Sequence, residues 1–258
     1  MTVSWFADIV FLFMRHLRIT LRMPVFLVVS VVQPILWILL FGQLFKSVAE
    51  VPGFGSAPYL DFLVPGIVIM SALFGSAFGG VGILVDLDRG VIDRMLATSV
   101  HRSALILARV SLSGAIVLVQ GALVLIVAFC LGVRIHGSIW SLAELLLTAA
   151  LLGVATSSFS NAMALLTRRQ EVLIAIINIS LLPLTFLSSM IMSHSLMPGW
   201  IRTVCKFNPV DWAVVLARTS FQGDGWIAGM PYLGRLLLLL VGCLYLATRS
   251  FRRYQDSL

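Results

Sequence analysis

The sequence predicts an all-α integral membrane protein. Six transmembrane helices are expected, with an N-terminal amphipathic helix in the membrane interface and an outer re-entrant helical hairpin between spans five and six. Of the 258 residues, 60% are hydrophobic and only 11% are charged, and the mean hydropathy is +1.04. A soluble fold of this size cannot hide so many apolar side chains, because too much of a small protein lies at its surface.

Residues 1–24 are predicted to lie in the plane of the membrane interface. Their apolar part is too short to cross a bilayer, and Arg15, Arg18 and Arg22 share one helical face that can rest on anionic lipid. Pro24 ends this helix because proline cannot continue the hydrogen-bond ladder. The rest of the single domain 1–258 follows as apolar runs of about 20 residues, the length that crosses a bilayer core. The expected spans are 25–45, 62–85, 104–133, 142–166, 172–193 and 231–248.

The loops predict the orientation of the chain. Lysine and arginine are concentrated in the N-terminal helix, in residues 86–102, at Arg168 and Arg169, and in the C-terminal tail. Cytoplasmic loops carry such an excess, so both termini are expected in the cytoplasm, which requires an even number of spans. The net charge of +7 is therefore explained by the charges of the cytoplasmic loops. Membrane lipid is the expected partner of these charges, and binding to nucleic acid is not expected.

Small and polar residues inside the spans predict helix packing. Gly75 and Gly79 have the small-xxx-small spacing that lets helix backbones approach closely. Arg109 lies near the start of the third span, where its aliphatic stem can carry the charge back to the surface. The fourth span has a stripe of polar groups that either bond across helices or line a path for cargo: Gly153, Thr156, Ser157, Ser160 and Asn161.

The outer side is predicted to carry two short helices, 197–207 and 209–221, as a half-inserted hairpin. Asn208, Pro209 and Asp211 have the pattern of a helix start: a capping side chain, a proline in the first turn and an acid at the positive end of the dipole. Gly223 is the expected stop.

The chain shows no pattern typical of catalysis. Its four histidines have no metal-ligand spacing, and no metal or cofactor is expected to bind this chain. A P-loop requires a Gly-Lys dipeptide, which does not occur, so the chain is not expected to hydrolyse ATP. Carriers driven by protons place acidic residues well inside spans, whereas every acidic residue here falls in a loop or near a span end.

One charged stretch, residues 86–102, stands between two long apolar runs. It holds three aspartates and three arginines and must lie in water, against headgroups or inside a partner. This stretch resembles the cytoplasmic segment of the membrane subunits of type-2 ABC exporters, in the daunorubicin-resistance-like branch. Residues 182–218 resemble the signature of the same family, from Leu182-Pro-Leu-Thr-Phe through Met197-Pro-Gly-Trp to Asn208-Pro and Arg218. Ser99 and residues 189–193 depart from the family pattern.

The resemblance implies a transporter in the bacterial inner membrane, built from two membrane subunits, identical or paralogous, and two ATP-binding subunits. The partner subunits would bind ATP and magnesium, and the cargo would be a hydrophobic or amphipathic compound such as a drug, antibiotic or lipid. A short coupling helix near 90–97 would contact the ATPase through residues of the charged stretch: Asp88, Arg89, Gly90, Val91, Asp93, Arg94, Met95 and Leu96. The outer hairpin would involve Pro198, Trp200, Asn208, Pro209, Asp211 and Arg218.

Two alternatives remain open from the sequence. The first is an ATP-independent secondary transporter or channel-like protein, and the second is a membrane scaffold without transport. A stable ATPase partner distinguishes the exporter from both.

Overall fold

The structure is a computed structural model that describes residues 2–22, 24–44, 59–96, 101–134 and 137–255. These described residues form helices and their connections, with no strand among them. The helices, in chain order, are α1 (Thr2–Leu21), α2 (Pro24–Leu44), α3 (Tyr59–Ala77), η2 (Phe78–Gly80), α4 (Val81–Asp88), α5 (Val91–Leu96), α6 (Arg102–Cys130), α7 (Ile139–Thr167), α8 (Gln170–Phe186), η3 (His194–Leu196), α9 (Gly199–Cys205), α10 (Pro209–Gln222), α11 (Gly225–Ala228) and α12 (Met230–Gln255).

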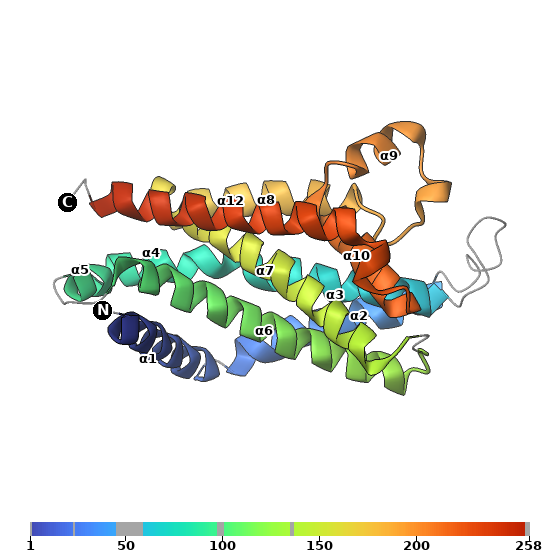
Figure 1. Cartoon of the computed structure of the whole chain (residues 1–258), viewed down its shortest axis with the longest axis horizontal. Coiled ribbons are helices and arrows are strands. Elements are labelled where there is room, and N and C mark those ends of the chain that lie inside the picture. Colours follow the sequence, from blue (N-terminus) through green and yellow to red (C-terminus); the bar gives the residue numbers. More distant parts are fainter. Residues whose placement is uncertain (1, 23, 45–58, 97–100, 135–136, 256–258) are drawn as a thin grey trace.

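The long helices lie along one axis of an elongated bundle (Figure 1). The N-terminal helix α1, the short helix α5 and the end of α12 lie at one end, and α9 and α10 lie at the other. Helix α7 is central, because α12, α6, α3 and α10 all pack against it. Both described chain ends therefore lie at the same end of the bundle as α5.

Four described helical segments are long and apolar enough to cross a membrane: Tyr59–Asp88, Ser103–Cys130, Ile139–Thr167 and Met230–Tyr254. Two further apolar segments, Val28–Leu44 and Gln170–Phe186, are shorter. At a rise of 1.5 Å per residue, a helix of about 17 residues covers roughly 25 Å, a little less than the hydrocarbon core. Each of the six segments overlaps one expected span in sequence, and four of the six are long enough to cross a membrane.

The fifth expected span, 172–193, is longer than the helix that occupies it. Helix α8 ends at Phe186, and an irregular turn of residues 187–193 follows. The cap residue Asn208 and Arg218 of α10 donate to carbonyl oxygens at the end of α8 and in this turn, so these carbonyls need no further helical partners. The apolar run alone did not indicate that these side chains would bind the carbonyls and that the helix would end at Phe186. The expected loop at 46–61 falls mostly outside the described residues.

The second span is interrupted by the 3-10 turn η2, where α3 and α4 meet α7. A Cβ atom added to Gly75 would lie 2.7 Å from Oε1 of Gln120 in α6, and one added to Gly79 would lie 2.7 Å from Oγ of Ser157 in α7. At Gly80 the approach is to backbone: the Cβ would lie 2.3 Å from the carbonyl oxygen of Ser160. The Gly80 N–H also donates to Oγ of Ser160 at 3.0 Å.

Gly80 should therefore be intolerant of even one methyl group. We expect Gly80→Ala to lower the free energy of unfolding by about 1–3 kcal/mol, because helix α7 must move to relieve the clash. Thermal unfolding of the purified protein in detergent measures this. Gly242→Ala is the matched control, because nothing lies within 4 Å of its added Cβ. Equal stability of the two variants would contradict close packing at Gly80.

Candidate functional site

The corner between α4 and α5 lies at the end of the bundle that holds both termini. Asp88 and Arg89 are exposed there, and Gly90 has a left-handed φ of 62°, a conformation that glycine adopts without strain. Arg94 closes back on this turn: its Nε donates to the Gly90 carbonyl at 3.1 Å and its Nη2 to the Arg89 carbonyl at 2.8 Å. The corner is thus a fixed turn that presents charged side chains outward.

The apolar side of α5 packs against the rest of the protein. Ile92 is buried, and Val91 and Met95 are half-buried. Ile92 and Met95 line a small pocket together with residues of α1, α4, α6 and α12. The exposed surface of this corner is therefore mostly polar. The side chains of Asp93 and Leu96 and the expected helix end at Ala97 lie outside the described residues.

A buried charge cluster lies behind this corner. Asp86 of α4 receives a hydrogen bond from Nη2 of Arg109 in α6, and Nη2 of Arg15 in α1 lies 3.6 Å from its other carboxylate oxygen. Exposed fractions of the Asp86 and Arg109 side chains are only 15% and 14%. Arg109 was expected to reach the surface, but the pairing with Asp86 keeps it inside, because a buried carboxylate requires a countercharge.

His16 completes the cluster from α1. Its Nε2 lies 3.9 Å from Asp86, too far for a hydrogen bond. Burial lowers the pKa of His16, the guanidinium groups of Arg109 and Arg15 lower it further, and Asp86 opposes them. The folded state therefore favours the neutral ring. The neutral His16 ring therefore contributes its full free energy of folding above the ordinary histidine pKa. This contribution is lost as pH falls through the lowered pKa of the folded state.

A second set of contacts holds the start of α1 against the start of α6. Asp8 accepts hydrogen bonds from the backbone N–H of His101 at 3.1 Å and pairs with its Nδ1 at 2.9 Å. Trp5 Nε1 donates to Ser103 Oγ at 3.0 Å. The hydrogen bond from the His101 ring holds the pKa of Asp8 below its usual range. Helix α1 is thus attached to the chain on both sides of α5.

At the opposite end of the bundle, Asn208 joins α8 to α10. Its side-chain oxygen accepts from the Val210 N–H at 2.9 Å and caps α10. Its amide nitrogen donates to the carbonyls of Leu184 and Leu187 at 2.8 and 2.6 Å. The predicted helix start at Asn208 and Pro209 is confirmed, as is the stop at Gly223, which is left-handed.

Arg218 fixes the irregular turn after α8. Its Nη2 donates to the carbonyls of Ser189 and Met190 at 2.6 and 2.9 Å, and its Nε to the carbonyl of Phe62 at 3.2 Å. The guanidinium also lies over the Phe62 ring, 3.5 Å from its centroid. A planar donor that is always charged suits several carbonyls at once. The sequence did not indicate these partners.

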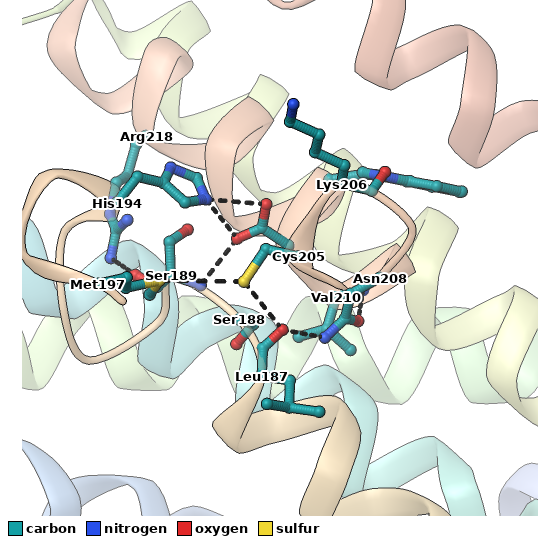
Figure 2. A network of polar contacts seen from close by, with 12 residues as sticks. Leu187, Ser188, Ser189, His194, Met197, Cys205, Lys206, Asn208, Val210 and Arg218 are labelled. Atoms are coloured by element: carbon teal, nitrogen blue, oxygen red, sulfur yellow. Dashed lines mark hydrogen bonds and ion pairs between the residues drawn. The ribbon is translucent and has the colours of Figure 1, made fainter. Parts of the chain in front are cut away.

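Asp211 is the centre of a third contact set at this end, and Figure 2 shows its partners Ser189 and His194. Its Oδ1 accepts from the Ser189 N–H at 2.7 Å, and both carboxylate oxygens lie 3.1 Å from Nε2 of His194. Cys205 is close by and donates to the Leu187 carbonyl at 3.2 Å. Burial and the charge of Asp211 raise the pKa of the Cys205 thiol.

Two predicted residues lie away from these contacts. The side chains of Pro198 and Trp200 are exposed at the start of α9, whereas Asn208, Pro209, Asp211 and Arg218 come together with the turn after α8. Sequence reasoning missed the Asp86 cluster, although an aspartate and an arginine at facing ends of successive spans were a signal for it. It also missed the proximity of His194 and Cys205 to Asp211, because no short spacing relates them.

The fold and these two polar ends define a multi-pass helical membrane protein. Residues 7–221 match the family model described as ABC-2 type transporter, and the chain belongs to this family. It is therefore a membrane transport subunit of a family whose members do not carry the ATPase site.

Named relatives cover most of the chain. It is 26% identical over 228 residues to the putative transport permease ycf38 of Cyanophora paradoxa, across 88% of this chain and 78% of the relative. It is 25% identical over 237 residues to the daunorubicin resistance ABC transporter permease protein DrrB1 of Streptomyces coeruleorubidus, across 91% and 81%. It is 24% identical over 212 residues to the probable doxorubicin resistance ABC transporter permease protein DrrC of Mycobacterium tuberculosis, across 82% and 74%.

The Asp86 cluster gives a testable stability prediction. We expect Asp86→Ala to lower the free energy of unfolding by about 3 kcal/mol, because two arginines would lose their buried counterion. Chemical or thermal unfolding in detergent measures this. Asp88→Ala removes the same group at an exposed position nearby and should change stability by less than about 0.5 kcal/mol. Similar losses in both variants would show that Asp86 is not a buried counterion.

Proposed function

We propose that this chain is the membrane-spanning subunit of an ATP-driven exporter, which carries a hydrophobic or amphipathic compound such as a drug, antibiotic or lipid-like molecule out of the cell. Two such membrane subunits, identical or paralogous, would assemble with two ATP-binding subunits that hold ATP and magnesium. The names of the two drug-resistance relatives support this assignment. The apolar outward faces of the helices suit lipid and a second membrane subunit.

The observation that carries the proposal is the α4–α5 corner. Its exposed side carries charge, while its inner side lines the same pocket as Arg15, His16, Asp86 and Arg109. A displacement of α5 would therefore move α1, α4 and α6 directly, because residues of all four helices line this pocket. This is the arrangement expected of a contact through which an ATP-binding subunit tilts the membrane helices.

Charge and shape together support one direction of insertion. Helix α5 and both described chain ends lie at one end of the bundle (Figure 1), and the excess of arginine lies in the same segments. Under the positive-inside rule that end is cytoplasmic. The six apolar segments then cross a bacterial inner membrane, with α9 and α10 as a re-entrant hairpin on the outer side.

The coupling assignment predicts that the charge of the corner selects the ATP-binding subunit. We expect the double variant Asp88→Arg, Arg89→Glu to reduce co-purification of that subunit by at least about tenfold, because like charges would then face each other. Transport by the reconstituted complex should fall in parallel.

The control for this experiment is Arg252→Glu, Arg253→Glu, which reverses two exposed charges on α12 at the same end. That variant should retain the ATP-binding subunit. Retention by both variants would show that the α4–α5 corner is not the contact.

The topology assignment can be tested with a cysteine at Thr203, an exposed residue of α9. In a Cys130→Ser background, a membrane-impermeant maleimide should label Thr203→Cys from outside intact cells. A cysteine at Arg253 should react only after permeabilisation. The remaining native cysteines, Cys205 and Cys243, are buried. Labelling of Thr203→Cys only from the cytoplasmic side would reverse the orientation.

A further inference from the structure

Three successive helices bring metal-binding atoms together at this end of the bundle. His194 is the first residue of η3, Cys205 is the last residue of α9, and Asp211 lies in the first turn of α10. Their ligand atoms all lie within 4.8 Å of one another, and His194 Nε2 is 3.1 Å from each Asp211 oxygen. Figure 2 shows His194 and Cys205 side by side, with the Cys205 sulfur next to Met197 and the Leu187 carbonyl.

We propose that His194, Cys205 and Asp211 form a binding site for a divalent metal ion, with zinc as the best fit. Imidazole nitrogen, thiolate sulfur and carboxylate oxygen are the three ligand types that zinc prefers. Zinc bonds of about 2.0–2.3 Å in tetrahedral geometry place ligand atoms about 3.3–3.6 Å apart. The pair of His194 and Asp211 is already near this separation. The Cys205 sulfur lies within 4.8 Å of both partners, so it needs to approach them by roughly 1.2–1.5 Å at most.

The surroundings support a metal ion rather than a hydrogen-bond network alone. The hydroxyl of Ser189 is buried and has no hydrogen-bond partner among the described residues, although the N–H of the same residue orients Asp211. Met197 Sδ lies 3.9 Å from Cys205 Sγ. A hydroxyl, a thioether or water can therefore complete the fourth position. The His194 side chain is 38% exposed, which gives an ion a route from solvent.

Charge also favours a dication. Binding would replace the thiol proton of Cys205, which leaves to solvent, so a thiolate and the Asp211 carboxylate would balance two positive charges. Arg218 is engaged with carbonyls of the turn, Ser189 and Met190, and leaves the Asp211 oxygens to the ion. Binding should therefore tighten as pH rises.

The ion would tie η3, which follows the turn after α8, to both α9 and α10. Such a site is structural: it would fix the hairpin on the end of α8 without taking part in transport chemistry. This inference concerns the chain itself and does not depend on the exporter assignment.

Cobalt titration tests the site, because a thiolate bound to cobalt gives a near-ultraviolet charge-transfer band. We expect the full chain, purified in detergent and freed of metal in the Cys130→Ser background, to bind one cobalt ion with this band and to release it to zinc. Cys205→Ser should lose the band, and His194→Gln should bind at least about tenfold more weakly.

The chain offers matched controls for both changes. Cys243→Ser removes another buried cysteine, and His101→Gln removes a histidine that is also 38% exposed and paired with an aspartate. Both should bind cobalt as the parent protein does. Zinc should raise the unfolding temperature of His101→Gln but not that of His194→Gln, which guards against misfolding of the Cys205 variant. Absence of the band from the parent, or its persistence in Cys205→Ser, would overturn the proposal.

Discussion

Backbone groups in an apolar surrounding must find partners within the protein, and the irregular parts of this structure depend on how they do so. Helices satisfy their own carbonyls, but α8 ends at Phe186 and the chain continues as a turn. Asn208, which caps α10, and Arg218 within α10 supply the missing donors. Both side chains reach back to residues that precede them by about 20 to 30 positions. The turn after α8 is thus held to α10 by polar side chains rather than by apolar contact alone.

The two ends of the bundle solve the problem of buried charge differently. At the end with α5, one carboxylate, Asp86, faces the side chains of two arginines and one histidine, and these come from α1 and α6. At the other end, the guanidinium of Arg218 donates hydrogen bonds to several backbone carbonyls. The first arrangement joins separate helices through charge, whereas the second holds a single turn in shape. Ion pairs therefore join the helices next to α5, whereas hydrogen bonds hold the turn next to α10.

Hydropathy and charge predicted the class, the order of the apolar segments and the start of α10 at Asn208 and Pro209. These features depend on local sequence: run length, loop charge and capping pattern. The end of α8 at Phe186 was not predictable in this way, because its cause lies in Asn208 and Arg218. The burial of Ile92 and the pairing of Arg109 with Asp86 also depend on helices that are distant in sequence. Such contacts leave no periodic pattern in one chain.

The 3-10 turn Phe78–Gly80 sets the rotation and the axial position of α4 relative to α3. A 3-10 helix advances about 2.0 Å and 120° per residue, and an α-helix about 1.5 Å and 100°. Conversion of these three residues to α geometry would rotate α4 and α5 by about 60° and draw them about 1.5 Å toward α3. The contact between Gly80 and Ser160 holds the present register. Packing of Gly80 against α7 therefore fixes the rotation of α4 and α5 relative to α3.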